Sequence, residues 1–247
     1  MKVSLEAYTS GRRTTELNLL LTTLGSAGDV NPFLAIGQAL RDRSHRVTLI
    51  TSSHFQEVAA QAGLAFAGLG TREDYAQVID DPDLWEPHRG FRVFVRRVIV
   101  PAIRPTYDIL TAHLQPNTVI VAQGQAFAGR LVHEKYDVPL ATVQLQPIAF
   151  RTIYDAPVIP KWIPIFARST LFKLIDFMIL DQEVANPINI LRSEFGLAPV
   201  QHIFGSWALS PQKIIGLFPA WFAAPQVDWP RTPNCQVLFS CSRNEHA

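Results

Sequence analysis

Apolar residues along this chain fall into short continuous runs that alternate with longer segments where they recur every three or four positions. The runs are typical of buried strands, and the longer segments are typical of helices. We expect strands at 17–23, 46–51, 64–69, 118–122, 139–145 and 213–217. We expect helices at 32–43, 54–62, 126–135 and 186–195, and either one kinked helix or two helices over 91–100 and 106–114.

This β-α-β-α order predicts an α/β fold, a Rossmann-like parallel sheet with helices on both faces. Pro32 suits the first turn of the first helix, where its missing N–H costs no hydrogen bond. Ser53 is the expected cap of the second helix, and Gly63 its expected end. Gly196 is expected to end the last helix. The polar stretch 70–90 predicts a long surface loop or an irregular helix.

Composition narrows the class of protein. Hydrophobic residues make up 48% of the 247 residues and charged residues 17%, which supports a sizeable core and disfavours disorder. The formal net charge of +1 disfavours a nucleic-acid partner, because such binders need a basic face. Arg92, Arg96, Arg97 and Arg104 recur at roughly helical spacing and form either a solvated helix face or a contact with phosphate or anionic lipid.

The positions of the cysteines and the hydropathy of the chain indicate its cellular compartment. The two cysteines both lie near the C-terminal end, which argues against a disulfide framework and fits a reducing compartment. We therefore expect a cytoplasmic protein, with peripheral membrane contact left open. The most apolar region, 158–180, is broken by prolines and charges and does not predict a membrane span. Its helical stripe either packs in the core or forms an acceptor or membrane groove, and comprises Leu171, Leu174, Ile175, Met178 and Ile179.

The strongest candidate site is the small-residue turn G-S-A-G after the first expected strand, with Asp29 directly behind it. Ligands of open α/β sheets bind at this carboxyl edge of the strands. The backbone N–H groups of such a turn, and the helix N-terminus that follows, suit a ligand. Asp29 either caps the helix or, with its pKa raised by a closed apolar cleft, acts as a general base. The residues expected to face a substrate or donor are Gly25, Ser26, Gly28 and Val30.

The sequence contains no motif for several other kinds of chemistry. The turn lacks G-x-G-x-x-G, which makes a nucleotide-dependent oxidoreductase a weak alternative. The seven histidines show no metal-ligand spacing, so we expect no metal. Serine hydrolases and P-loop NTPases are disfavoured because G-x-S-x-G and the P-loop lysine motif are missing.

The same residues carry a family resemblance. G-S-A-G-D-V-N-P-F-L-A-I-G-Q-A-L, followed by H-R-V-T-L-I-T, resembles the opening of GT-B glycosyltransferases, in particular the sterol-glucosyltransferase-like group with a family 28 N-terminal domain. D-P-D-L-W-E-P at 81–87, H-E-K-Y-D-V-P at 133–139 and the block 210–230 resemble most the catalytic chain of bacterial rhamnosyltransferases. The resemblance spans about 17–230.

The resemblance implies an N-terminal half of a GT-B fold that binds a lipid-like or other hydrophobic acceptor bearing a hydroxyl. In the intact parent, Asp29 would be the general base for transfer of a hexose or deoxyhexose with inversion. Plant relatives place a histidine at the corresponding position. A nucleotide sugar would be the co-substrate, and no metal or other cofactor is expected. The acceptor-lining candidates are Gln123, Gln146 and Phe150.

The resemblance also sets the expected domains. We expect a flexible extension at 1–16, the acceptor-binding domain at 17–230 and an unpatterned tail at 231–247. Relatives continue after the D-W-P segment with a donor domain, so we expect a truncation or frameshift near 231–234, and no transfer by the chain alone. The alternative is a non-catalytic Rossmann-like binding module that acts with a separate donor-domain chain.

Overall fold

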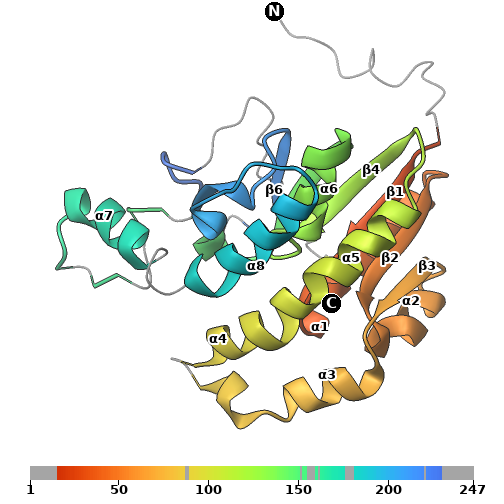
Figure 1. Cartoon of the computed structure of the whole chain (residues 1–247), viewed down its shortest axis with the longest axis horizontal. Helices are drawn as coiled ribbons and strands as arrows, with labels where there is room; N and C mark the ends of the chain where they lie inside the picture. Colours follow the sequence, from red (N-terminus) through yellow and green to blue (C-terminus); the bar gives the residue numbers. More distant parts are fainter. Residues whose placement is uncertain are drawn as a thin grey trace, which may run out of the picture.

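The computed structural model describes residues 16–86, 89–150, 152–154, 159–160, 162–175, 181–219 and 221–229. The predicted α/β fold is confirmed: six parallel strands form one sheet in the order β3-β2-β1-β4-β5-β6, with helices on both faces (Figure 1). The tail 231–247 and most of the N-terminal extension lie outside the described residues.

The strands are β1 (Asn18–Thr22), β2 (Arg46–Ser52), β3 (Ala65–Leu69), β4 (Thr118–Gln123), β5 (Leu140–Gln144) and β6 (Lys213–Gly216). The α-helices are α1 (Ala27–Arg41), α2 (Gln56–Gln61), α3 (Arg72–Ile79), α4 (Gly90–Phe94), α5 (Val100–Ala112), α6 (Ala128–Tyr136), α7 (Ile165–Ile175) and α8 (Asp181–Glu194). Short 3₁₀ helices cover Ser53–Phe55, Pro82–Trp85 and Pro147–Phe150, and π turns cover Val95–Ile99 and Ile203–Trp207. Each predicted strand is present, with every bound within one residue of its prediction.

The core lies on both faces of the sheet, which is why the strands are continuous apolar runs rather than alternating ones. All five residues of β1 are buried. Leu19 and Leu21 pack into the cluster beneath α1 and α2. Leu20, which points to the opposite face, packs into the cluster beneath α5, α6 and α8.

The strand order places β1 beside β4, although the two strands are separated by five α-helices and two strands in the sequence. Their register pairs Thr22 with Ala122, so both strands end at the same edge of the sheet. The chain runs outward from β1 to β3 on one side and from β4 to β6 on the other. This reversal of direction is the topological switch point at which open α/β sheets bind ligands.

The first helix begins earlier than predicted. We expected 32–43, but α1 begins at Ala27 and contains Pro32 in its interior. Ser26 has an extended backbone, with φ −87° and ψ −178°, and the carboxylate of Asp29 accepts a hydrogen bond from its N–H. This is the reciprocal half of a capping box, which starts the helix ahead of the proline. Pro32 leaves the carbonyl of Gly28 without its helical donor, and Gly28 is exposed to water.

The polar stretch 70–90 is more helical than predicted. It contains α3 and a 3₁₀ turn, and α4 starts at its end. Thr71 and Asp74 form a reciprocal capping box at the start of α3. The kinked-helix alternative is confirmed for the region that follows, because α4, the π turn at Val95–Ile99 and α5 form one continuous helical run. Proline inside a helix removes a backbone donor, and π turns are one way in which helices accommodate such a break.

Two helix-boundary predictions concern single residues. Ser53 does not cap α2: it begins the 3₁₀ turn Ser53–Phe55 that leads into α2, and Ser52 caps that turn, its hydroxyl accepting from the N–H of His54 at 3.3 Å. Gly63 and Gly196 follow α2 and α8 with φ of +68° and +72°, which confirms both predicted helix ends. The last helix, α8, starts at Asp181, five residues before its predicted start.

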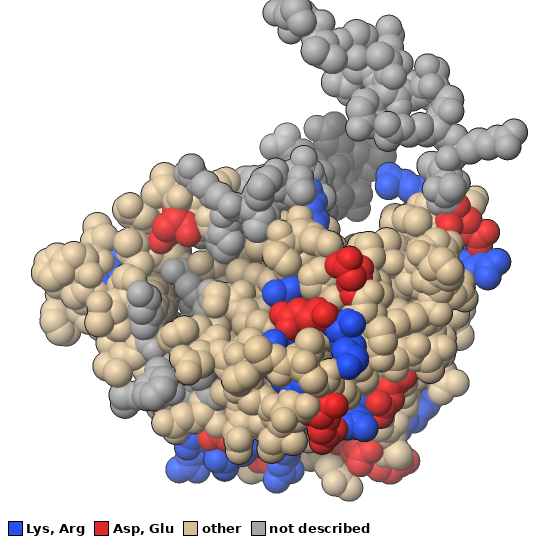
Figure 2. Space-filling model, turned by 45° about the horizontal axis from the view of Figure 1, so that its top comes forward, with Lys and Arg blue, Asp and Glu red and all other residues tan. Residues whose placement is uncertain are grey.

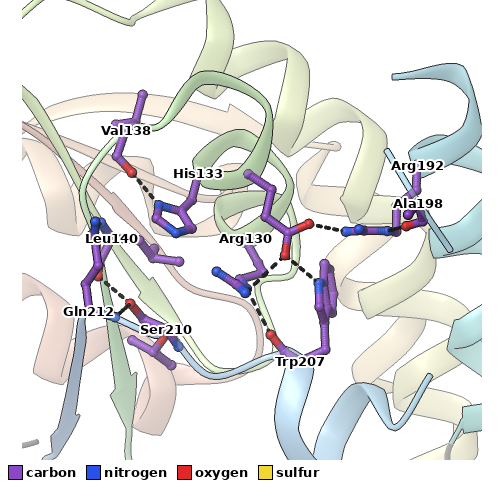
Figure 3. A network of polar contacts seen from close by, with 11 residues as sticks. Arg130, His133, Val138, Leu140, Arg192, Ala198, Trp207, Ser210 and Gln212 are labelled. Atoms are coloured by element: carbon purple, nitrogen blue, oxygen red, sulfur yellow. Dashed lines mark hydrogen bonds and ion pairs between the residues drawn. The ribbon is translucent and has the colours of Figure 1, made fainter. Parts of the chain in front are cut away.

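A buried polar network attaches α8 and the turn at Ile203–Trp207 to α6 (Figure 3). The carboxylate of Glu134 accepts from Arg192, from Arg130 at 3.0 Å and from the indole N–H of Trp207 at 2.9 Å. Arg130 also donates to the carbonyl of Trp207 at 3.1 Å. Each of these charges has an opposite partner, which offsets the cost of burial.

The helical stripe predicted around 171–179 falls partly on α7, which Figure 1 shows at the end of the molecule remote from β3. Leu171 packs against the small cluster of Ile159 and Phe172, whereas Leu174 is exposed. Met178 and Ile179 lie outside the described residues. Among the residues described, no helix is long and apolar enough to cross a membrane.

Candidate functional site

Asp29 lies at the carboxyl edge of the sheet, at the switch point between β1 and β4. It occupies the third position of α1 and is partly buried. One carboxylate oxygen, Oδ2, accepts from the N–H of Ser26 at 3.0 Å and from its hydroxyl at 3.3 Å. The other, Oδ1, accepts from the side-chain amide of Gln123 at 2.9 Å. The carboxylate is therefore held from both sides.

Gln123 makes this arrangement possible because it ends β4, the strand beside β1. Its side chain is almost fully buried, with 5% exposed. Its carbonyl oxygen accepts from the N–H of Leu24 at 2.8 Å and from the hydroxyl of Thr23 at 3.0 Å. These two bonds fix which end of the amide points at Asp29, so that the NH₂ group donates to the carboxylate. Gln123, which was predicted to line the acceptor site, thus holds the carboxylate of Asp29.

The electrostatic setting of Asp29 has two opposing parts. Burial raises its pKa above the ordinary 3.8, because a partly enclosed carboxylate loses hydration. The hydrogen bonds from Ser26 and Gln123 favour the charged form and bring the pKa part of the way back. The net direction is upward. A carboxylate with a raised pKa is a stronger base than a fully solvated aspartate.

The turn before Asp29 needs glycine at its first position. Gly25 has φ +124°, which favours glycine, and a Cβ there would lie 2.3 Å from Oδ2 of Asp29. Ser26 and Gly28 are exposed at the edge of the sheet, as a ligand-facing role requires. Val30 is fully buried in the core beneath α1, so its side chain points away from this edge.

The other two predicted acceptor-lining residues differ in their surroundings. Gln146 is exposed just after β5. Phe150 is buried and packs against Phe218 and Trp229, with ring centroids 5.9 Å and 4.9 Å away. Phe150 therefore belongs to an aromatic cluster rather than to an open surface.

Three polar residues at or close to this edge of the sheet were not predicted from the sequence. Thr23 joins the Gln123 contacts and also donates to the backbone carbonyl of Asp29 at 3.2 Å. Tyr75 of α3 has a raised pKa, first because of burial and then because of the negative charge of Asp29. Gln144 ends β5 and places its amide against Gly124. The available signal was their position, since Thr23 and Gln144 lie at or just after the end of a strand.

The arginines considered as a phosphate or lipid contact are ion-paired instead. Arg96 binds Glu183 at 2.7 Å, Arg97 binds Asp81 at 3.1 Å, and Arg104 binds Glu194 at 2.6 Å. Figure 2 shows basic and acidic side chains interspersed on the visible face. The described residues contain no group of three or more histidine, cysteine or acidic side chains that could hold a metal ion.

Comparison with known proteins identifies the family. Residues 19–154, more than half of the chain, match the model of the glycosyltransferase family 28 N-terminal domain. The chain belongs to this family. A sterol 3-beta-glucosyltransferase of Arabidopsis thaliana is 43% identical to it over 54 residues, which are 22% of this chain and 8% of that protein. A UDP-sugar-dependent glycosyltransferase of Dictyostelium discoideum is 23% identical over 186 residues, 70% of this chain and 10% of that protein.

Solved structures agree on the fold of this family 28 chain. The glycosyltransferase of kitacinnamycin superposes with a TM-score of 0.63 at 14% identity, covering 94% of this chain and 54% of that one. The calicheamicin glycosyltransferase CalG4 superposes with a TM-score of 0.56 at 21% identity, covering 85% and 48%. The chain thus spans about half the length of these glycosyltransferases. The fold is the Rossmann-like half of a GT-B enzyme.

Proposed function

We propose that this chain is the acceptor-binding half of a glycosyltransferase in which Asp29 is the general base. The single observation that supports the proposal most is the carboxylate of Asp29, fixed by Ser26 and Gln123 at the switch point of the sheet. A base must be held in place and must keep a free lone pair. Each carboxylate oxygen can accept more than one hydrogen bond, so Oδ1 can still accept from a substrate hydroxyl.

The proposed reaction is a single displacement. The acceptor O–H donates to Asp29, and its proton passes to the carboxylate as the acceptor oxygen attacks the anomeric carbon of the sugar. The bond between that carbon and the diphosphate oxygen breaks, and the nucleoside diphosphate leaves with the electron pair. A single displacement of this kind inverts the configuration at the anomeric carbon. The upward shift in the pKa of Asp29 favours the proton transfer.

The proposed substrates come from the relatives. Their names specify sterol 3-beta-glucosyltransferases and a UDP-sugar-dependent enzyme, so we take a hydrophobic alcohol of the sterol type as acceptor and a UDP-sugar as donor. Binding of cholesterol by the chain, compared with binding of a soluble polar aglycone, tests the acceptor class. A preference for the polar aglycone would contradict it.

The general-base role is tested with Asp29→Asn in the native protein that carries this sequence, with transfer from UDP-glucose to cholesterol as readout. Asp42→Asn is the matched control, because Asp42 is an exposed acid at the other end of α1. We expect Asp29→Asn to lower kcat by about 100-fold or more, the usual contribution of a general base, with little change in sterol affinity. A loss below about fivefold, or an equal loss in the control, would overturn the role.

Whether the 247-residue chain acts alone is a separate question that the same assay addresses. An acceptor-binding half without a donor domain should bind the sterol and transfer nothing. The alternative of a binding module with a separate partner predicts transfer only after a donor-domain chain is added. Transfer by the 247-residue chain alone would contradict both.

A further inference from the structure

A second glutamine at the carboxyl edge of the sheet, Gln144, has an amide that the fold does not use. It is the last residue of β5, and only 8% of it is exposed. Its backbone carbonyl accepts from Leu217 at 2.8 Å. Its side-chain amide makes no hydrogen bond to any described residue, and it is not among the unpaired polar atoms sealed from solvent. The amide is thus largely buried, unpaired and still reachable from the edge.

This arrangement is unusual because buried amides are normally hydrogen-bonded. Gln123, the neighbouring example, uses both ends of its amide within the protein. Because solvent still reaches this amide, a ligand hydroxyl at the edge of the sheet can hydrogen-bond to it in place of water.

The space for the Gln144 amide depends on Gly124. A Cβ on Gly124 would lie 2.2 Å from Nε2 and 2.6 Å from Oε1 of Gln144. The amide therefore lies directly against the backbone of Gly124, the residue after Gln123. Two amides thus flank the end of β4: that of Gln123 donates to Asp29, and that of Gln144 lies on the next residue.

We propose that the Gln144 amide binds a neutral hydroxyl group of the substrate at the carboxyl edge of the sheet, across the end of β4 from Asp29, and that Gly124 keeps this position open. An amide offers one acceptor and two donors without charge, which matches a hydroxyl that both donates and accepts. The hydroxyl belongs either to the acceptor or to the transferred sugar. That the hydroxyl is a substrate's rests on the proposed function.

The test is an NMR titration of the labelled 247-residue chain with cholesterol and, separately, with methyl β-D-glucoside. The side-chain NH₂ resonance of Gln144 reports the contact, and that of Gln115 is the reference, since Gln115 is exposed at the opposite edge of the sheet. We expect the resonance of Gln144 to move with one probe and that of Gln115 to stay. A response to cholesterol assigns the site to the acceptor, and a response to the glucoside assigns it to the sugar.

Three variants complete the experiment. Gln144→Leu removes the amide at similar volume, and Gly124→Ala displaces it. Both substitutions should therefore lower the affinity for the responding probe about fivefold to tenfold, as expected for one hydrogen bond. Gln115→Leu should bind as the wild type does. Cholest-5-ene, which lacks the hydroxyl, should bind Gln144→Leu and the wild type equally if the acceptor is the source. Gln144→Leu also keeps the test valid if Gly124→Ala fails to fold.

The inference is overturned if neither probe moves the Gln144 resonance more than that of Gln115, or if Gln144→Leu binds both probes normally. Its failure is distinct from that of the proposed function. Normal transfer by Asp29→Asn with a responding Gln144 would remove the base and leave the binding group. Loss of transfer in Asp29→Asn, with a Gln144 resonance that responds to neither probe, would support the base and remove the binding group.

Discussion

Replacing Gln123 by leucine is the sharpest test of how Asp29 is held. Leucine keeps most of the volume but removes the contacts to Leu24, Thr23 and Asp29. Thr23 keeps a second acceptor, the carbonyl of Asp29, so its hydroxyl loses little. The N–H of Leu24 becomes a buried donor without a partner, which costs about 1–3 kcal/mol. With a smaller loss at the partly exposed Asp29, we expect the free energy of unfolding to fall by about 2–4 kcal/mol.

The effect on Asp29 separates a positioning role from a merely structural one. Loss of the Gln123 donor removes one of the interactions that lower the pKa of Asp29, so this pKa should rise further. Gln123→Glu should raise it as well, since a carboxylate can accept from Leu24 and Thr23 but cannot donate to Asp29 and adds a like charge. The assay is urea unfolding together with an NMR titration of the Asp29 carboxyl in each variant.

Gln125→Leu is the control, because Gln125 is a partly exposed glutamine two residues later that contacts Gln123 at only 3.4 Å. It should change stability by no more than about 0.5 kcal/mol and leave the pKa of Asp29 in place. The reasoning fails if Gln123→Leu leaves the pKa of Asp29 at its wild-type value. It also fails if Gln123→Leu is no less stable than Gln125→Leu.

Three further predictions concern stability. Glu134→Ala should lower the free energy of unfolding in urea by about 3–5 kcal/mol, because it leaves two buried guanidinium groups without their carboxylate partner. A loss below about 1 kcal/mol would contradict the network in Figure 3. Gly37→Ala should cost about 1–3 kcal/mol by thermal unfolding, as its Cβ would lie 2.6 Å from Leu64; unchanged stability would show that Leu64 yields freely. The raised pKa of Asp29 means that the folded state binds this proton more tightly, so the contribution of Asp29 to stability has a negative slope as pH rises from 3.8 through that pKa, opposite in sign to the slope from acids with a lowered pKa such as Asp74. Asp29→Asn should abolish this slope, and parallel pH–stability curves for the two proteins would refute the shift.

The central strands β1, β4 and β5 could be predicted from the sequence because each is a continuous apolar run that is buried on both faces. The helices were harder where burial gives no pattern. No residue of α3 is buried, so no apolar period marks it, and its only signal is the Thr71–Asp74 capping box. The start of α1 was missed for a related reason: Pro32 was read as the first turn, whereas Ser26 and Asp29 start the helix five residues earlier.

The candidate site was likewise predictable where its pattern is local, and not predictable where it depends on how the strands are ordered in the sheet. The position of Asp29 follows from a local pattern, a strand, a glycine turn and an acid. Its contact with Gln123 spans 94 residues, and it exists because β4 lies beside β1 in the sheet. Strand order is not written in a local pattern, so the sequence placed Gln123 near the ligand but not on the carboxylate. Phe150 was predicted as acceptor-lining from the family resemblance, yet its partners Phe218 and Trp229 lie far along the chain and bury it.

The two roles considered for Asp29, helix cap and general base, do not compete in this structure. The capping contact uses Oδ2, and the contact with Gln123 uses Oδ1. An asparagine at this position could satisfy only one of these donors, because its NH₂ group would face either Ser26 or Gln123, and the orientation of Gln123 is fixed by Leu24 and Thr23. The surroundings therefore select a carboxylate over its amide. Burial meanwhile raises the cost of its charge, which a proton from a bound hydroxyl would relieve. The contact that begins the helix would thus, together with the contact from Gln123, also orient a base.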